Sequence, residues 1–219
     1  GFIFLIPVLF IGLMVWLFVR ARRLAEERRR MLQSVAAQMG WAFTDDDASF
    51  SMIPNLGTYY LFSQGHSRKI ENMLYGEVDG GRAAVFDYTY VTGHGKHRQR
   101  HYQTVAYFQS RDLSLPSFSL RPENVLHKVF GAFGYQDIDF AQRPEFSKQY
   151  LLRGQDESAI RRTFSDRLLA FYETNPRLST DGGADQLFFY QENVAVSPEN
   201  VQQFVQWGRG LLHLYKNPW

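Results

Sequence analysis

The chain contains no cysteine. Disulfides, zinc–thiolate sites, iron–sulfur clusters and a thiol nucleophile are therefore excluded together. Cysteine usage gives no indication of the redox compartment. With 219 residues, of which 45% are hydrophobic and 16% aromatic, the chain is long enough to bury a core, and its length favours one compact domain with an appendage.

Charged and strongly polar residues are also missing from residues 2–19. A helix of this length, at about 1.5 Å per residue, measures roughly 27 Å, which is close to the hydrocarbon thickness of a bilayer. We therefore expect residues 1–19 to form a transmembrane helix. A cleaved signal peptide would carry its basic residues before the apolar run and small residues after it, which is not the order here. The aromatic anchor side chains would be Phe2, Phe4, Phe10, Trp16 and Phe18.

A basic cluster follows the apolar run directly. Residues 20–30 carry a local charge of +4, which leaves −2 for the rest of a chain whose net charge is +2. Arg and Lys beside a span are retained on the cytoplasmic side, so the following domain is expected in the cytoplasm. A domain without strong positive charge argues against a nucleic-acid partner. Expected contacts with anionic lipid headgroups or a partner are Arg20, Arg22, Arg23, Arg28, Arg29 and Arg30.

Residues 20–40 are predicted to continue the helix as a basic juxtamembrane segment. Oppositely charged residues recur four apart there, which supports helix formation. Apolar residues at helical spacing follow and indicate a face packed on the domain. Gly40 is the expected end of the helix. The apolar stripe consists of Met31, Leu32, Val35, Ala36 and Met39.

Residues 41–219 are predicted to form an α+β domain with a mostly antiparallel sheet and about three packed helices. Residues 72–78 and 82–91 alternate as strands around a turn at Asp79-Gly80-Gly81, and residues 101–110 form a further strand. Further expected elements are a short helix from Pro122, a strand at 148–154, an amphipathic helix at 156–173 with Ile160, Phe164, Leu168 and Phe171 on one face, a hairpin at 178–191 around Asp181-Gly182-Gly183, and a helix at 197–215.

An internal similarity suggests two related hairpin–helix halves, about 70–134 and 176–215. The segments "PENVLHKVFGAFG" (122–134) and "PENVQQFVQWGRG" (198–210) agree at several positions, and each follows a DGG sequence. The other interpretation is that proline and glutamate simply begin helices at both places.

Three histidines gather in "TGHGKHRQRH": His94, His97 and His101. Their spacing makes them candidate metal ligands, but the intervening Lys96, Arg98 and Arg100 would repel a dication. We expect instead a solvated loop, or a basic contact with phosphate headgroups or an acidic partner.

No sequence motif indicates an enzyme. Walker, complete GxGxxG and GxSxG patterns are missing, and "TDDD" at 44–47 lacks the spacing of a calcium loop and is interpreted as a turn or cap. Asp87, Asp137 and Asp139 are the carboxylates in apolar settings, for which pairing with an arginine is the commoner role. No cofactor is expected.

Four segments together resemble a family of uncharacterised bacterial proteins with one amino-terminal span and a cytoplasmic α+β domain. They are "RRLAEERRRMLQSVAAQMGWAF", "GGRAAVFDYTY", "QTVAYFQS" with "LPSFSLRPEN", and "PEFSKQYLLRGQDESAIRRTFS". The resemblance implies an anchored protein of the bacterial inner membrane and no catalytic residues.

The leading functional hypothesis is a non-catalytic accessory or stabilising subunit of a larger inner-membrane complex, with a photosynthetic, respiratory or transport host. Its partners would be other membrane-protein subunits, contacted through the span and the domain. A free-standing anchored module that binds a protein or anionic lipid is the second hypothesis. An unrecognised hydrolase that uses Asp87 or a histidine is the third.

Overall fold

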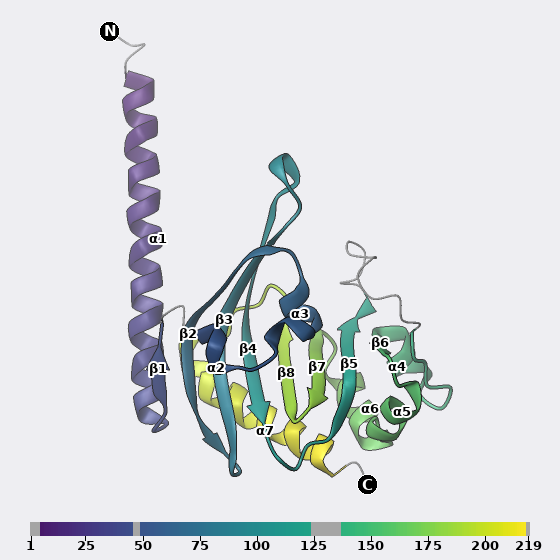
Figure 1. The fold of residues 1–219 in the computed structure, drawn as a ribbon. Coiled ribbons are helices and arrows are strands. Elements are labelled where there is room, and N and C mark those ends of the chain that lie inside the picture. Colours follow the sequence, from purple (N-terminus) through teal and green to yellow (C-terminus); the bar gives the residue numbers. More distant parts are fainter. Residues whose placement is uncertain (1–4, 46–48, 124–136, 218–219) are drawn as a thin grey trace.

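The computed structural model describes residues 5–45, 49–123 and 137–217. One long helix is followed by a sheet domain with helices on both faces (Figure 1). The helices are α1 (Leu5–Gln38), α2 (Ser49–Met52), η2 (Leu56–Thr58), α3 (Tyr60–Ser63), η3 (Gly95–His97), α4 (Pro144–Gln149), α5 (Glu157–Thr163), α6 (Asp166–Thr174), η5 (Pro198–Asn200) and α7 (Val201–Lys216). The strands are β1 (Ala42–Thr44), β2 (His66–Val78), β3 (Gly81–Thr92), β4 (Gln99–Gln109), β5 (Leu115–Pro122), β6 (Tyr150–Gly154), β7 (Leu178–Ala184) and β8 (Gln186–Gln191).

The strands form one eight-stranded sheet in the order β1-β2-β3-β4-β8-β7-β5-β6. Every pair in it is antiparallel, which confirms the predicted α+β class. Successive residues of a strand point to opposite faces, so Val85 and Phe86 enter different cores. One core lies beneath α1 and α4 to α7, and the other lies beneath α2, η2 and α3. The many aromatic residues mainly fill these two cores.

The first hairpin agrees with the sequence. Val78 pairs with Gly81, and the two turn residues Asp79 and Gly80 both have positive φ, of 51° and 74°. This is the conformation that Asp-Gly favours in two-residue hairpin turns. The second hairpin is placed wrongly in the sequence prediction, because Asp181 and Gly182 lie inside β7 and the turn comes at Ala184 and the next residue.

Helix α1 is continuous through the predicted boundary at residue 19 and ends close to Gly40. Gly40 has a φ of 67°, and the Trp41 N–H donates to the Ala36 carbonyl at 2.8 Å, which closes the last turn. Leu32 and Ala36 are buried against the domain as predicted, whereas Met31 is 43% exposed. Over the described part of the chain, no helix combines the length and the apolar character needed to cross a membrane. The transmembrane assignment of residues 1–19 stays a prediction.

The helices in the second half of the chain differ in part from the prediction. The expected helix at 156–173 is two helices, because Ser165 takes extended dihedrals and caps α6 by accepting a hydrogen bond from the Leu168 N–H. Ile160, Phe164 and Leu168 are still buried on the same side, and α7 follows the predicted range closely. Helix α4 was not predicted. The predicted helix from Pro122 falls mainly on residues outside the described ranges, and so does the first half of the suggested repeat at its carboxyl end.

Candidate functional site

A buried carboxylate fixes α1 to the sheet. Asp87 of β3 is 2% exposed and lies opposite Thr104 of β4. Arg28 binds it through two nitrogens, from Nε to Oδ2 and from Nη2 to Oδ1, both at 2.8 Å. Asn72 donates to Oδ2 at 2.9 Å, and the Thr104 hydroxyl donates to Oδ1 at 2.9 Å. One carboxylate therefore joins α1, β2 and β4.

The backbone positions these donors. Asn72 lies at an irregularity in the pairing of β2 with β3 and has a φ of 53°, which turns its amide toward Asp87. Arg28 Nη1 also donates to the Val196 carbonyl at 3.0 Å, and the Val196 N–H donates to the Thr104 hydroxyl at 2.9 Å. The segment before α7 thus completes the junction. We call Arg28, Asn72, Asp87, Thr104 and Val196 the α1 junction.

The electrostatics of the junction favour the ionised pair. Burial would lower the pKa of Arg28, but its hydrogen bonds to Asp87 and the charge of Asp87 outweigh burial and raise this pKa above its ordinary value. Burial, followed by the charge of Asp87, raises the pKa of Tyr102. Because four donors occupy the Asp87 oxygens, this carboxylate is poorly placed to take a proton from a substrate. Arg28 is thus removed from the predicted headgroup contacts, since its guanidinium binds inside the junction.

The first half of α1 projects away from the sheet domain (Figure 1). From Leu9 to Val19 its large hydrophobic side chains are between 41% and 65% exposed, including the predicted anchors Phe10, Trp16 and Phe18. Nothing is described of the side chains of Phe2 and Phe4. A continuous apolar patch of this kind marks a surface that meets lipid or another protein.

Arginines border this apolar surface. The guanidinium carbon of Arg20 lies 5.1 Å from the ring centroid of Trp16, and that of Arg22 lies 4.5 Å from that of Phe18. Such contacts let a long basic side chain cover apolar surface while its charge stays in water. Arg23 and Arg30 are also exposed, whereas Arg29 forms an ion pair with Asp45 at 3.3 Å. We call Arg20, Arg22 and Arg23 the arginine collar.

The histidines do not converge on a metal. His94 stacks on His66 with ring centroids 5.2 Å apart, whereas His101 stacks on Tyr90 at 4.5 Å. Within residues 5–45, 49–123 and 137–217, no group of three or more metal-ligating side chains is close enough to hold an ion. Lys96, Arg98 and Arg100 are exposed around the same hairpin end.

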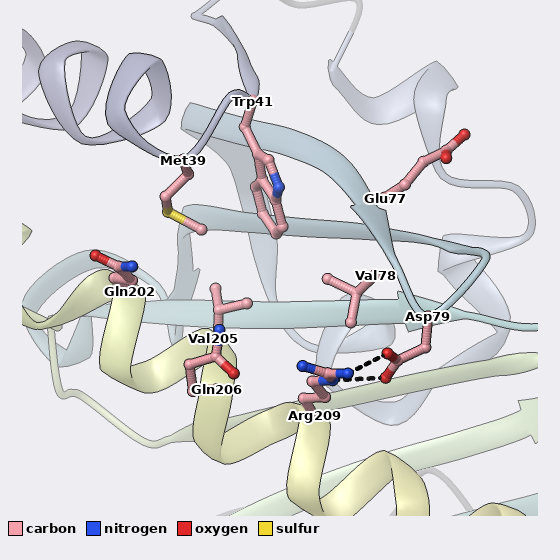
Figure 2. Close-up of a pocket in the computed structure, with 9 residues that line it drawn as sticks. All are labelled: Met39, Trp41, Glu77, Val78, Asp79, Gln202, Val205, Gln206 and Arg209. Carbon is pink, nitrogen blue, oxygen red and sulfur yellow. Dashed lines mark hydrogen bonds and ion pairs between the residues drawn. The ribbon is translucent and has the colours of Figure 1, made fainter.

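A pocket of about 270 Å³ lies between the end of α1, the β2–β3 turn and α7. Figure 2 shows Arg209 of α7 directed at Asp79 of the turn, to which Arg209 Nε donates at 2.8 Å. This hydrogen bond is the largest cause of a lowered pKa of Asp79. The charges of Arg209 and His213 lower this pKa further, whereas burial opposes the shift. The lining combines apolar with polar and charged side chains. The lining residues are Met39, Trp41, Glu77, Val78, Asp79, Gln202, Val205, Gln206 and Arg209.

A larger pocket of about 480 Å³ lies beside the α1 junction. Its lining includes Thr104 and Val196 of the junction and the aromatic side chains of Phe204 and Trp207 of α7. Val194 at its border is 42% exposed. Polar side chains, among them Gln191, Asn200 and Gln203, complete the lining.

A second buried ion pair was missed in the sequence. Arg121 of β5 and Asp181 of β7 are 3% and 0% exposed, and Arg121 Nη2 donates to both Asp181 oxygens, at 2.8 and 2.7 Å. The Leu61 N–H of α3 donates to Asp181 at 3.0 Å, which ties α3 to the sheet. Glu192 lies 4.0 Å from Arg121 Nε. The sequence contains one sign of this ion pair, an arginine within the alternating segment "SFSLRP". Its partner was missed because Asp181 was predicted to lie in a turn.

The remaining predicted acids have local partners. Asp137 forms an ion pair with Arg153 at 2.6 Å, and the carbonyl of Asp139 accepts from Arg161 at 2.7 Å. Asp45 accepts a hydrogen bond from the Asn72 N–H at 3.0 Å, while the next two aspartates lie outside the described residues.

Comparison with known proteins gives one informative similarity. No protein-family model matches the chain, and no curated protein matches it either. The fold is similar to that in the crystal structure of the mycobacterial trehalose monomycolate transport factor A, TtfA. That alignment has a TM-score of 0.58 and 13% identity over 86% of this chain and 91% of the other. At such low identity the similarity shows a shared fold and nothing about activity.

Proposed function

We propose that this protein is a non-catalytic accessory subunit of a bacterial inner-membrane assembly. The observation that carries the proposal is the α1 junction, which holds an exposed apolar helix at a set position on a folded domain. A helix that only tethered the domain would need no buried ion pair to the sheet. The junction suits an accessory subunit whose helix and sheet domain contact other subunits at the same time, because it fixes the position of one relative to the other.

The exposed half of α1 supports burial in a membrane or among partner helices. Full removal of a Leu, Ile, Val, Phe or Met side chain from water gains roughly 1.5–3 kcal/mol, and the apolar stretch from Leu9 to Val19 presents many such side chains. By the positive-inside rule, the arginine collar at its end supports a cytoplasmic position for the sheet domain. Residues 1–19 would be the anchor and the inner membrane the location.

Transport is the host process that the shared fold favours. The similar structure is named as a transport factor, so we place the accessory role in a transport assembly ahead of a photosynthetic or respiratory one. A free-standing anchored binding module is the second candidate, favoured by the exposed basic hairpin end. A hydrolase that uses Asp87 is disfavoured, since the carboxylate oxygens accept four hydrogen bonds within the chain.

Co-isolation tests the proposal. The full chain, with a carboxy-terminal tag, is extracted gently from native membranes, and mass spectrometry identifies what co-migrates at fixed stoichiometry. We expect membrane-protein subunits. Leu13→Asp should lower recovery in membranes and in the complex, because an acidic residue within a span costs about 3 kcal/mol.

Leu24→Asp is the matched control, since Leu24 is exposed on the same helix but beyond the arginine collar. It should leave both recoveries unchanged. A chain recovered alone, or two variants that behave alike, would contradict the proposal.

A further inference from the structure

The β3–β4 hairpin extends beyond the rest of the sheet. Strand β4 pairs with β3 from Gln99 to Gln109, whereas β8 pairs with β4 only from Val105 onward. On the other edge of the hairpin, β2 stays paired with β3 as far as His66 with Val91. The end of the hairpin beyond Val91 therefore extends past both neighbouring strands as an arm. Figure 1 shows that this arm and the first half of α1 project from the domain toward the same side.

The end of the arm is basic. Lys96, Arg98 and Arg100 are exposed, and no acidic residue occurs between Tyr88 and Gln109. Among the described residues, none of the ion pairs involves these three side chains. We call Lys96, Arg98 and Arg100 the basic tip. Its charge is available for a ligand outside the chain.

The backbone of the tip is ordered by local contacts. Gly93 and Gly95 have φ of 72° and 56°, and a Cβ at Gly93 would overlap the His97 carbonyl oxygen. The His97 N–H donates to the His94 carbonyl at 3.1 Å, and His94 stacks on His66 of β2. The three exposed basic side chains therefore belong to a turn whose backbone is held by a hydrogen bond and ring stacking.

The Arg28–Asp87 contact joins α1 to β3, so distances along both elements can be measured from it. These distances show how far the arginine collar and the basic tip lie from the same point. From Arg28 to Arg20 the helix rises about 12 Å. From Asp87 to Thr92, at the start of the tip, the strand rises about 17 Å. Because both elements run toward the same side, the tip reaches at least the level of the collar (Figure 1).

We propose that the basic tip is a second membrane contact, which binds anionic lipid headgroups while α1 holds the chain in the bilayer. This inference rests on the proposed anchoring of α1. With two contacts, the collar and the tip, the domain is prevented from turning about the α1 axis and presents one defined face to its partners. Each Lys or Arg near an anionic surface contributes about a fivefold change in partition.

Spin labelling of the full chain tests the inference, and the lack of cysteine makes a single label site straightforward. His97→Cys carries the label at the tip, and Ser158→Cys on α5 carries it at an exposed distant site. The chain is reconstituted in nanodiscs of phosphatidylcholine alone or mixed with phosphatidylglycerol, and collisions of the label with a water-soluble nickel chelate are measured. At the tip we expect collisions to fall about fivefold or more in the anionic discs, with no change at residue 158.

Charge-neutralising variants separate the tip from charge in general. Lys96→Gln, Arg98→Gln and Arg100→Gln together should remove the difference between the lipids. The matched control is Lys148→Gln, Arg162→Gln and Arg167→Gln, which removes the same number of exposed charges elsewhere and should retain it. Salt of about 1 M, where the screening length is about 3 Å, should abolish tip protection without releasing the chain.

The outcomes distinguish the two proposals. Equal collision rates in both lipids, from a chain that stays in the disc, would overturn the inference and leave the accessory role standing. An acidic protein as the true partner of the tip would give that same result. A chain that leaves the discs in salt would overturn the anchoring of α1 and the inference with it.

Discussion

Glu192 shows how one ionisable group responds to the buried pair beside it. Its side chain is 17% exposed and lies 4.0 Å from Arg121, whose charge is already matched by Asp181. Burial raises the pKa of Glu192 from its ordinary 4.5, Arg121 partly opposes this, and the charge of Asp181 adds to it. The ionised form of Glu192 is therefore less favourable in the folded chain than in the unfolded chain.

This shift predicts a pH-dependent gain from Glu192→Gln. Since the folded-state pKa is above 4.5, ionisation of Glu192 costs no stability below that pH, and the cost grows as the pH rises through the folded-state pKa. The variant should match the parent protein in acid and unfold at a slightly higher temperature near neutral pH. Thermal unfolding of the full chain in detergent, measured across pH, tests this.

Glu199 provides a control of opposite sign. A hydrogen bond from its own backbone, followed by one from Ser197, lowers the pKa of Glu199. Glu199→Gln should therefore remove a stabilisation that is present above pH 4.5 and lost on acidification. If Glu192→Gln lowers the unfolding temperature at neutral pH, the attraction of Arg121 outweighs burial and the prediction is wrong.

At the scale of elements, α7 approaches the sheet closely at one glycine. A Cβ at Gly208 would overlap the ring of Phe189 in β8, whereas a Cβ at Gly210 would meet nothing within 4 Å. Both glycines lie in the same helix. Gly208 is therefore needed for packing, and Gly210 is not.

The two glycines predict opposite effects of the same substitution. Gly210→Ala should raise the free energy of unfolding by up to about 1 kcal/mol, the difference in helix propensity. Gly208→Ala should lower it by about 1–2 kcal/mol, because overpacking costs about 1–3 kcal/mol and exceeds the propensity gain. Chemical denaturation of both variants measures this. Equal stabilisation by both would show that α7 does not pack against Phe189 as described.

Element boundaries also show where local patterns mislead. The apolar spacing of 156–173 suits one helix, but the Ser165 cap divides it in two. Three of the four residues predicted on its buried face are buried, whereas Phe171 is half-buried and Tyr172 is buried in its place. Asp-Gly-Gly makes the turn at Asp79 and not at Asp181, because Asp181 binds Arg121 and Gly182 leaves room for the Phe118 ring. The same three residues have different structures in different tertiary surroundings.

At the scale of the whole molecule, the α1 junction couples the exposed helix to the sheet domain. We predict that Asp87→Asn uncouples them, because it leaves the guanidinium of Arg28 without its counter-charge. Removal of one partner from a buried pair costs about 3–5 kcal/mol, and the 18% exposure of Arg28 suggests the lower part of that range. The free energy of docking α1 should fall accordingly.

Distance measurements between spin labels test the uncoupling. Labels at Arg23→Cys and His97→Cys report the separation of α1 from the hairpin arm, and their distance distribution should broaden in Asp87→Asn. Arg30→Ala is the control, since Arg30 is 78% exposed and its ion pair among the described residues is with Glu26 of the same helix. An unchanged distribution in Asp87→Asn would mean that packing of Leu32 and Ala36 alone holds the helix.

The sequence by itself determined what depends on local period and turn chemistry. The alternation of strands, the Asp79-Gly80 turn, the helix that ends near Gly40 and the charge step after residue 19 were all readable, because each depends on neighbours within a few residues. The tertiary structure alone decided which carboxylate meets which arginine. Arg28 and Asp87 are 59 residues apart, and Arg121 and Asp181 are 60. Such pairs form only after strand order and register are set, since a shift of one residue would turn each side chain to the other face.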